Sequence, residues 1–462
     1  MFLVLAGYMA YFNVSLADEL KANPNNTKME EQKQYVVRGS IYSADGEILA
    51  GTNVDSEGNE TRIYPFGNVF AHTVGYTTNG KTGLEAIYNT DLLTSNTSIV
   101  EQVGKGVKNE KVRGDSLILT LDSRLQTVAS TALGAYRGAV VVMEPSTGRV
   151  LAKVSKPDFD PNTMEEDWRY LTAEDSQSPL LDRAMQGLYP PGSCFKILTT
   201  LAYMRQYPSD YMNYTFDCGG VLTQGDMSIQ CYDGEVHGYE DLQGSFQHSC
   251  NTSYANIGLM LDNDEFADLC EDFLFNSELP TVLPYSSSRF ELNGKSSDGD
   301  VMTTAIGQGN TLVSPFHMAL ITCAVANDGR LMYPYMVERI ENTEGVKVSE
   351  TKPMQYKKLM TSEEASTIKS YMRSVVEGGT ASSLWNDSYT VAGKTGSAEY
   401  EVVGNAEAEE NFSTHSWFVG FSNVDDPDIV VSVIAEDGGT GSSAAVPIAK
   451  AIFDAYYSYN MG

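Results

Sequence analysis

The sequence predicts an α+β protein with more than one domain. Its 462 residues are about three times the length of a typical domain, which favours two or three domains. Apolar residues make up 42% of the chain and charged residues 20%, as in ordinary globular proteins. Strand-like and helix-like segments are mixed without a regular strand–helix–strand repeat, which argues against a doubly wound parallel sheet. Disordered, collagenous and coiled-coil architectures are excluded for the chain as a whole.

The charge balance excludes a nucleic-acid-binding protein. Asp and Glu number 61 against 31 Lys and Arg, so the formal net charge is −30. Proteins that bind nucleic acid carry a basic patch or stripe, and this composition offers no such footprint. The acidity favours solubility and repels polyanions.

Residues 1–17 form an uncharged, mostly apolar segment. A membrane-spanning helix needs about 20 apolar residues, so this segment is slightly short, and it contains Asn13 and Ser15. Two interpretations stay open: a membrane span whose basic cytoplasmic flank is missing from this start, and a buried N-terminal helix. We favour the membrane anchor, which places the rest of the chain on one side of the membrane. The polar residues 18–34 are predicted to be a linker.

The first domain is predicted to contain several strands and one helix. Residues 36–50 hold two apolar runs around Ala44-Asp45-Gly46, which is typical of a hairpin turn. Residues 117–121 have the composition of a strand, and residues 124–135 have apolar side chains at helical spacing. We place the boundary between the domains near residue 136.

The second domain, residues 136–462, is predicted to open with another hairpin. Its apolar runs at 139–145 and 148–155 are joined by Pro-Ser-Thr-Gly. Residues 429–437 are predicted to be a late strand. Residues 444–457 carry apolar side chains at helical spacing, with a proline in the first turn, and are predicted to be a helix.

The segment 189–204 contains a Ser-x-x-Lys pattern at the expected start of a helix. Ser193 lies in the first turn, and Lys196 lies three residues later on the same face. A hydroxyl becomes a good nucleophile only when a base takes its proton, and a lysine with a lowered pKa can do this. A match of this kind is weak alone, because a helix start with an exposed lysine looks the same.

Two further patterns follow Ser-x-x-Lys in a particular order. Ser249-x-Asn251 lies 56 residues after Ser193, and Lys394-Thr395-Gly396 lies 145 residues after Ser249. Each is common by chance, as a polar helix face or a turn. Together, in this order, they form a known signature of enzymes that acylate a serine.

On these motifs the chain resembles the penicillin-binding proteins, specifically the class B, monofunctional D,D-transpeptidases of peptidoglycan synthesis. The resemblance covers nearly the whole chain, and residues 18–135 leave too little room for a glycosyltransferase domain. It implies a transpeptidase domain over 136–462, with an antiparallel sheet flanked by helices, after a smaller β-rich pedestal or dimerisation domain over 18–135. Further segments that match the family are Arg38–Tyr42, Asp45-Gly46, Gly83–Glu85, residues 119–126, Tyr189–Ser193, Ala305–Gly309 and Trp417–Gly420.

The resemblance implies a role for each residue of the first two motifs. Ser193 is expected to be the nucleophile, which forms an acyl-enzyme with the penultimate D-Ala carbonyl of a stem peptide. Lys196 is expected to be the general base, Ser249 to relay a proton to the leaving group, and Asn251 to hold the substrate amide. Cys194, inside the first motif, removes no required group.

The third motif is expected to bind the substrate. By the resemblance, Lys394 and Thr395 recognise the terminal carboxylate of the stem peptide or of a penicillin, and Gly396 and Ser397 complete this segment. A cationic donor beside a hydroxyl suits a free carboxylate. The backbone N–H groups of Ser193 and Ser397 are expected to form the oxyanion hole. Ser397 stands where the family often has threonine.

The resemblance also implies partners and a location. The acyl group passes to an amine on a neighbouring stem peptide, β-lactams inhibit covalently, and catalysis needs no cofactor. A multi-spanning glycosyltransferase is the expected partner, and the catalytic domain is expected on the extracytoplasmic side of the cell membrane, in cell-wall organisation and cell shape. Two alternatives stay open: a D,D-carboxypeptidase or β-lactamase with the same acylation chemistry, and a non-enzymatic β-lactam sensor.

Four residues with metal-ligating side chains lie close together in the sequence: Cys218, Cys231, His237 and Cys250. A Cys₃His set is a sensible closed zinc site, and by resemblance some elongation-type members of the family carry zinc in the corresponding region. A Cys218–Cys231 disulfide and unpaired buried thiols are the alternatives. A zinc ion here would be structural.

Residues 158–176 are rich in Asp and Glu. We predict a solvated surface loop for them. A rim that orients the incoming amine-bearing strand is the alternative.

Overall fold

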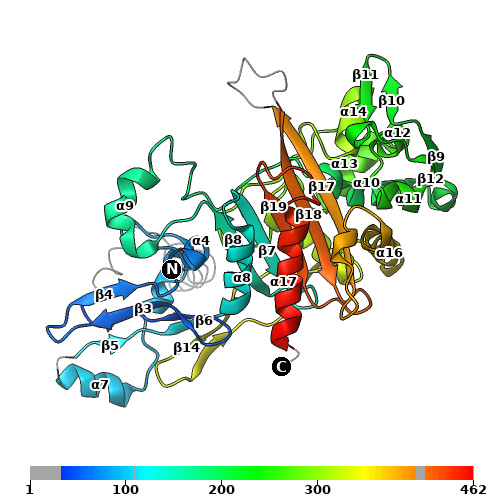
Figure 1. Cartoon of the computed structure of the whole chain (residues 1–462). Coiled ribbons are helices and arrows are strands. Elements are labelled where there is room, and N and C mark those ends of the chain that lie inside the picture. The colour runs from blue at the N-terminus through cyan, green and yellow to red at the C-terminus, as the bar shows by residue number, and fades with distance from the viewer. Residues whose placement is uncertain (1–32, 109, 402–411, 461–462) are drawn as a thin grey trace, which may run out of the picture. The chain divides into compact units, whose positions relative to one another are not determined.

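The computed structural model describes residues 33–108, 110–401 and 412–460. The predicted membrane anchor and most of the predicted linker lie outside the described residues. The chain divides into two compact units and passes between them more than once, whereas the predicted boundary near residue 136 divides it once (Figure 1). The first unit comprises the chain up to Ser123 with Asp158–Leu180 and Tyr335–Lys352; the second comprises Arg124–Pro157, Leu181–Pro334 and the chain from Pro353.

The first unit is built on a six-stranded mixed sheet. The hairpin predicted at 36–50 is confirmed, because β2 and β3 pair antiparallel and Gly46 in their turn has a φ of 89°, which favours glycine. The strand predicted at 117–121 is β6, which pairs in parallel with β2. In spatial order the strands are β15 (Lys347–Glu350), β14 (Val337–Glu341), β6 (Ser116–Leu119), β2 (Ile41–Tyr42), β3 (Ile48–Val54) and β4 (Glu60–Ile63).

A buried carboxylate forms ion pairs with two arginines inside the first unit. Glu85, in the short helix α5 (Gly83–Ile87), is fully buried. Its carboxylate accepts hydrogen bonds from Arg38 Nε at 2.6 Å and from Arg62 Nε at 2.7 Å. Burial favours the protonated acid, but the two guanidinium groups outweigh it and lower the pKa of Glu85. The carboxylate therefore stays ionised in the interior.

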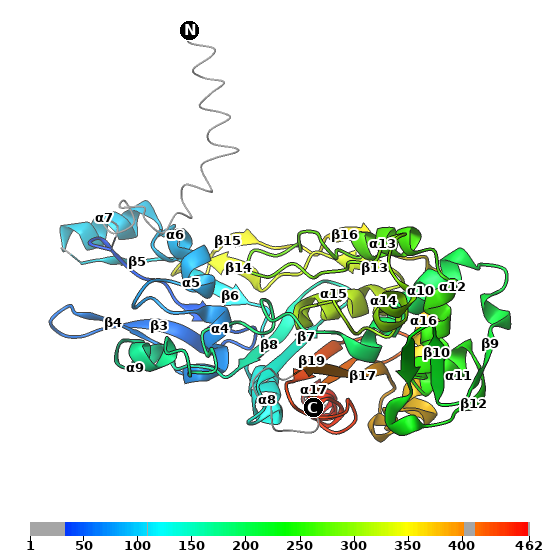
Figure 2. The same cartoon turned by 90° about the horizontal axis from the view of Figure 1, so that it is seen from above.

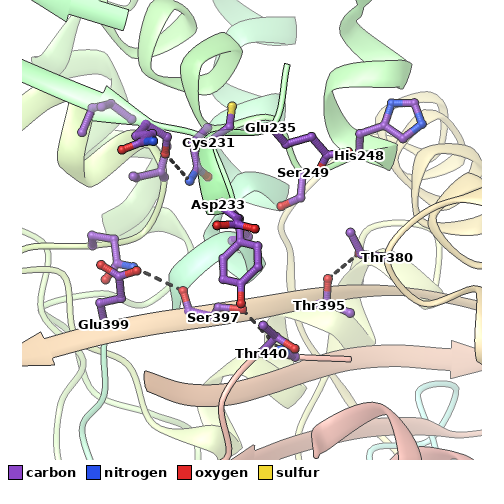
Figure 3. Close-up of a pocket in the computed structure, with 18 of the residues that line it drawn as sticks. Cys231, Asp233, Glu235, His248, Ser249, Thr380, Thr395, Ser397, Glu399 and Thr440 are labelled. Carbon is purple, nitrogen blue, oxygen red and sulfur yellow. Dashed lines mark hydrogen bonds between the residues drawn. The ribbon is translucent and has the colours of Figure 1, made fainter. Parts of the chain in front are cut away.

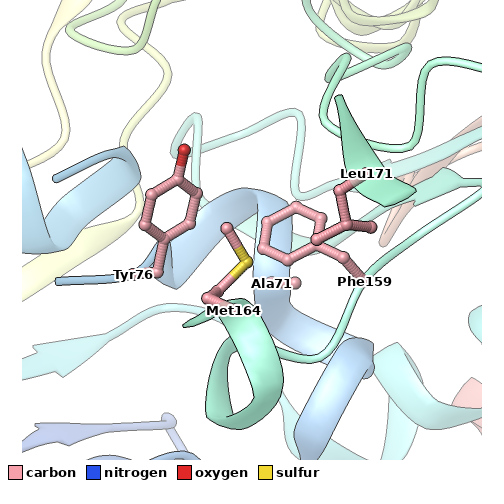
Figure 4. Packing of buried hydrophobic residues seen from close by; sticks show 5 residues of the cluster. All are labelled: Ala71, Tyr76, Phe159, Met164 and Leu171. Carbon is pink, nitrogen blue, oxygen red and sulfur yellow. The ribbon is translucent and has the colours of Figure 1, made fainter. Parts of the chain in front are cut away.

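The acidic side chains of residues 158–176 are largely exposed, as predicted for a solvated segment, but the prediction of a loop is wrong for part of it. It contains the helix α9 (Met164–Leu171), whose ends bury Met164 and Leu171. These two side chains pack with Phe159, Ala71 and Tyr76 in a small hydrophobic cluster (Figure 4). Three of the seven acidic residues, Glu165, Glu166 and Asp167, lie in the first turn of α9, at the positive end of the helix dipole.

The second unit is built on a five-stranded antiparallel sheet. The hairpin predicted at 139–145 and 148–155 is confirmed as β7 and β8, and the late strand predicted at 429–437 is confirmed as β19. Among the described residues, strand β17 (Val391–Glu401) lies at an edge of the sheet and has β18 (Phe412–Ser422) as its one partner. In spatial order the strands are β17 (Val391–Glu401), β18 (Phe412–Ser422), β19 (Val430–Ala435), β7 (Gly138–Met143) and β8 (Val150–Lys156).

Helices cover both faces of this sheet. On one face α17 (Ala445–Asn460), the helix predicted at 444–457, packs against β18 and β19. On the other lies α15 (Pro315–Ala326), whose twelve residues are all buried (Figure 2). The antiparallel sheet flanked by helices confirms the predicted fold class. The helix α8 (Ser123–Leu133), predicted at 124–135, is also present.

Several helices and paired strands of the second unit lie beyond the edge strand β17 (Figure 1). Within the described part of the chain, no helix is both long and apolar enough to cross a membrane. The elements beyond β17 are the helices α10 (Lys196–Gln206), α11 (Leu242–Gln247), α12 (Asn251–Met260), α13 (Asn263–Asp272), α14 (Asp298–Ala305) and α16 (Ser362–Gly378), with the paired strands β9 (Thr215–Cys218) and β12 (Gly238–Asp241), and β10 (Val221–Gln224) and β11 (Met227–Gln230).

Candidate active site

A cavity of about 820 Å³ lies in the second unit, next to the edge strand β17 (Figure 3). Three separate parts of the chain bring sequence-predicted residues to it: the turn before α10, the connection between α11 and α12, and β17. The predicted catalytic and substrate-binding residues that line it are Ser193, Ser249, Asn251, Thr395 and Ser397. Segments that lie more than 200 residues apart in the sequence therefore meet at one cavity.

The turn that carries Ser193 is a short 3₁₀ helix, Gly192–Phe195, that leads directly into α10. Gly192 has a φ of 53°, and a Cβ atom there would lie 2.7 Å from the backbone oxygen of Ser397. Its N–H donates to the backbone oxygen of Gly307 at 2.9 Å. Only glycine allows this approach, which places the Ser193 turn against the backbone of β17 at Ser397.

Residues of the five-stranded sheet and of the loop after it also fix the position of the chain before Ser193. Trp417 Nε1 donates to the backbone oxygen of Pro190 at 3.0 Å. The hydroxyl of Tyr189 donates to the Glu436 carboxylate at 2.8 Å, and Arg183 donates to the same oxygen at 2.8 Å. These contacts to β18 and to the residue after β19 fix the approach to the turn. The sequence did not point to Arg183 or Glu436.

Lys196 is fully buried and lies among polar groups of the α11–α12 connection. Its Nζ donates to the backbone oxygen of Ser249 at 2.7 Å and to Asn251 Oδ1 at 2.8 Å, and it lies 3.3 Å from Ser249 Oγ. Burial, together with the positive charge of Lys394, holds the pKa of Lys196 well below its usual range. An amine in this setting gives up its proton more readily than an ordinary lysine and can then serve as a base.

Lys394 is the second fully buried amine, and it approaches the same hydroxyl from β17. Its Nζ donates to Ser249 Oγ at 2.9 Å and to the backbone oxygen of Thr395 at 3.1 Å. Burial lowers its pKa to about 8, which keeps the amine mainly cationic at pH 7. The Ser249 hydroxyl therefore lies between two buried amines.

Ser249 adopts an unusual backbone conformation. Its φ is 58°, in the left-handed region that residues with a side chain seldom occupy. The next residue, Cys250, is the N-cap of α12, and its Sγ accepts from the N–H of Ser253 at 3.4 Å. Asn251 begins α12 and donates through Nδ2 to the backbone oxygen of Gln230 at 3.0 Å. Strain of this kind is concentrated at functional sites.

Strand β17 presents Thr395 and Ser397 to the cavity. Sequence reasoning missed Thr380, whose Oγ1 lies 2.5 Å from Thr395 Oγ1. It also missed Gly441, whose N–H donates to Ser397 Oγ at 3.3 Å. Gln308, within a segment that the resemblance marked, donates to the backbone oxygen of Ser397 at 3.2 Å. The signal available for Thr380 is the Gly-Gly pair that precedes it at the end of a helix.

Gly396 lies between these two residues, where no side chain fits. A Cβ atom at Gly396 would lie 2.9 Å from the backbone oxygen of Pro191 and 3.0 Å from Cys194 Sγ. Cys194 is buried and directs its thiol to the backbone oxygen of Lys394 at 3.4 Å. The cysteine therefore packs behind the strand and leaves the cavity to its neighbour Ser193.

The four candidate metal ligands meet at one point beside the cavity. Their ligand atoms, from Cys218, Cys231, His237 and Cys250, all lie within 4.8 Å of one another. The sulfur atoms of Cys218 and Cys231 are 3.7 Å apart, and those of Cys231 and Cys250 are 3.8 Å apart. Hydrogen bonding from the Cys250 thiol lowers the pKa of Cys231. The ionised thiolate is the form of cysteine that binds a metal, so a lowered pKa favours binding.

This geometry separates the alternatives for the cysteines. A disulfide bond has sulfur atoms about 2.05 Å apart, and all six cysteines are free thiols, so the Cys218–Cys231 disulfide is not formed. Zinc–sulfur distances of about 2.3 Å in a tetrahedron put the sulfur atoms about 3.8 Å apart. The donor set and its spacing therefore fit a tetrahedral zinc ion.

Comparisons with known proteins agree with the site. A family model described as the penicillin-binding protein transpeptidase domain matches residues 138–454, and one described as the penicillin-binding protein A dimerisation domain matches residues 38–117. The peptidoglycan D,D-transpeptidase PbpA of Mycolicibacterium smegmatis is 29% identical over 463 residues, which cover 95% of this chain and 92% of that protein.

Solved structures show the same fold. A ceftriaxone acyl-enzyme complex of penicillin-binding protein A from M. tuberculosis matches with a TM-score of 0.83 and 25% identity, over 92% of this chain and 99% of that one. The D,D-transpeptidase domain of a peptidoglycan glycosyltransferase from Eggerthella lenta matches with a TM-score of 0.80 and 28% identity, over 92% and 98% of the two chains. Since the transpeptidase model spans more than half of the sequence, the chain belongs to the penicillin-binding proteins, and the predicted resemblance to their class B members is confirmed.

Proposed function

We propose that this chain is a peptidoglycan D,D-transpeptidase, which cross-links stem peptides through an acyl-enzyme on Ser193. The observation that carries the proposal is the bridge made by the Ser249 hydroxyl, which lies 2.9 Å from Lys394 Nζ and 3.3 Å from Lys196 Nζ. This bridge lies at the cavity that Ser193 lines. Family membership and the names of the relatives support the same reaction.

In the first step Ser193 Oγ attacks the carbonyl carbon of the penultimate D-Ala. The proton of the hydroxyl passes to Lys196, since burial holds the pKa of this amine well below its ordinary range. The backbone N–H groups of Ser193 and Ser397 stabilise the negative oxygen of the tetrahedral intermediate, since the two residues are held close through Gly192.

The intermediate then collapses and the peptide bond to the terminal D-Ala breaks. The leaving amine needs a proton, and Ser249 relays one to it from the protonated Lys196. Asn251 holds the amide of the stem peptide. Lys394 and Thr395 hold the terminal carboxylate, because a cation beside a hydroxyl matches a carboxylate in charge and in hydrogen bonding. The free edge of β17 lies beside the peptide in this arrangement.

In the second step the amine of a neighbouring stem peptide attacks the Ser193 ester. The new peptide bond forms, the ester bond breaks, and Ser193 regains its proton. A β-lactam enters by the same first step, and its ring amide takes the place of the scissile bond. No step requires a cofactor.

The cellular setting is part of the same proposal. Residues 1–17 act as the membrane anchor, residues 18–135 as the pedestal, and residues 136–462 work on the extracytoplasmic side of the cell membrane. The growing glycan strands come from a multi-spanning glycosyltransferase partner.

We also propose that Cys218, Cys231, His237 and Cys250 hold a structural zinc ion, because their spacing fits a tetrahedral site. Metal analysis of the purified chain tests this, with Cys231→Ser as the variant and Cys270→Ser, a buried cysteine outside the set, as the control. We expect about one zinc per chain in the wild type and in the control and none in Cys231→Ser. Metal-free wild-type protein prepared in zinc-supplied medium contradicts the assignment.

The function is tested by intact mass after incubation with benzylpenicillin, with Ser193→Ala beside the wild type, followed by a cross-linking assay with stem peptides and a polymerase. We expect one stable adduct on the wild type alone, and cross-linked product. No adduct on either protein refutes the serine mechanism. Rapid turnover of penicillin indicates a β-lactamase, release of D-Ala to water a carboxypeptidase, and an adduct without any peptide turnover a sensor.

A further inference from the structure

Thr380 approaches the cavity from a different part of the fold than the three motifs. It follows α16, lines the cavity, and its Oγ1 lies 2.5 Å from Oγ1 of Thr395 (Figure 3). Thr395 itself is almost fully buried, with 6% of its surface exposed. The two hydroxyls therefore share one hydrogen bond at the wall of the cavity.

Thr380 is held in place by close backbone packing. A Cβ atom on the preceding Gly379 would lie 2.4 Å from the backbone oxygen of Gln247 and 2.9 Å from the Cα of Val375. Gln247 ends α11, two residues before Ser249. The N–H of Ala381 donates to the backbone oxygen of Val375 at 3.1 Å. Thr380 thus lies where α16, α11 and β17 meet, and its position follows from all three.

The hydroxyl pair has only two protons to distribute. Each threonine hydroxyl has one O–H to donate and can accept as well. When Thr395 donates to Thr380, it has no proton left for a ligand in the cavity. When Thr380 donates to Thr395, the proton of Thr395 is free to point to a ligand carboxylate. The second arrangement also strengthens the Thr395 donor, because hydrogen bonds in a chain polarise one another.

We propose that Thr380 is a positioning residue for carboxylate recognition: it donates its proton to Thr395 and so turns the Thr395 hydroxyl toward the carboxylate of the substrate or of a penicillin. The inference rests on the proposed function, since it concerns the same cavity. The oriented Thr395 hydroxyl adds specificity for ligands with a free carboxylate, in addition to the attraction of the Lys394 charge.

Acylation by two probes tests the proposal. The probes are benzylpenicillin and its methyl ester, which lacks the anionic carboxylate, and the second-order acylation rate is measured by intact mass. The variants are Thr380→Val, which keeps the shape and removes the hydroxyl, and Thr380→Ser, which keeps the hydroxyl. Thr322→Val is the control, because the Thr322 hydroxyl is buried in α15 and donates to Met318 within the same helix.

We expect Thr380→Val to lower the acylation rate with benzylpenicillin roughly 3- to 10-fold, because the hydrogen bond that orients the Thr395 hydroxyl joins two neutral groups. The rate with the methyl ester should change by less than about twofold, and Thr380→Ser and Thr322→Val should keep the wild-type preference. An equal loss with both probes means a structural role and overturns the proposal, as does an unchanged rate with benzylpenicillin. A wild type that neither probe acylates refutes the proposed function instead.

Discussion

Two buried charged clusters, one in each unit of the chain, are built in opposite ways. In the first unit, Glu85 is fully buried and is paired with two arginines, Arg38 and Arg62. In the second unit, Lys196 and Lys394 are fully buried near one hydroxyl, and among the described residues no carboxylate lies within ion-pair distance of either amine. The Glu85 carboxylate is paired with groups of opposite charge. The two lysine amines instead contact uncharged hydroxyl, amide and carbonyl groups.

The difference teaches what each cluster does. Pairing lowers the pKa of Glu85, so the carboxylate stays ionised and acts as a fixed part of the fold. Burial without pairing lowers the pKa of both lysines, to about 8 for Lys394. These shifts suit the roles proposed for the two amines, Lys196 as a base and Lys394 as a carboxylate-binding group. Stability is given up at such a site in return for reactivity.

The largest effect is expected from removing the base. Lys196→Met should lower the rate of acylation by benzylpenicillin by about 10³- to 10⁴-fold, because Ser193 then lacks the group that takes its proton. The rate is measured under single-turnover conditions, and the fold is checked by circular dichroism. A variant that folds normally and is acylated within tenfold of the wild-type rate would show that Lys196 is not the base.

The next effect tests the paired cluster. Glu85→Gln should lower the local stability of the first unit by about 3–5 kcal/mol, because two buried arginines lose their counter-charge. Hydrogen exchange at the amides of β2 and β3 measures this. Glu60→Gln is the matched control, since Glu60 pairs with Lys111 at the surface and should cost less than about 1 kcal/mol. Equal effects of the two substitutions would contradict the contrast between the clusters.

The pH dependence of the same cluster has a definite sign. Since the pKa of Glu85 is lowered on folding, its stabilising contribution is present above the ordinary value of about 4.5. It is lost as the pH falls through the lowered value. Glu85→Gln should therefore differ from the wild type less at strongly acidic pH than at pH 7.

The smallest expected effect is on the free energy of unfolding, because the burial of Lys394 destabilises the second unit. Its pKa is about 8 in the folded chain against 10.5 as the ordinary value, so the unfolded chain binds more protons between these values and stability rises with pH there. Lys394→Met removes this slope. The stability of the variant relative to the wild type should fall by roughly 2 kcal/mol from pH 7 to pH 10. Urea unfolding at both pH values measures it, and a constant difference would show that Lys394 has its ordinary pKa.

Much of the fold was predictable because the relevant signals are local. The hairpins at 36–50 and 139–155 follow from apolar runs around turn residues, and α17 follows from its helical spacing. The helix α9 was missed because the acidic residues of its first turn hide a short apolar face, which becomes buried only through tertiary contacts. The return of residues 335–352 to the first unit has no local signal either.

The residues of the candidate site differ in the same way: some have a local sequence signal, and others depend on tertiary contacts. Ser193, Ser249 and Lys394 carry motif signals; the structure brings Ser193 and Ser249 to one cavity, and Lys394 donates a hydrogen bond to Ser249. Thr380 is a single threonine after two glycines, and its importance depends on a contact 15 residues away in sequence. The cysteine spacings do not resemble a zinc finger, so the tetrahedral arrangement of the thiols could not be deduced from the sequence.

The pH dependence of acylation of the wild-type chain by benzylpenicillin tests the central claim most directly. We predict a bell-shaped profile of the second-order rate. It rises as Lys196 loses its proton, at a pH well below the ordinary lysine value, and falls near pH 8 as Lys394 loses its charge. A rate that only rises, with a single titration at about pH 10.4, would contradict the account, because both lysines would then behave as ordinary amines.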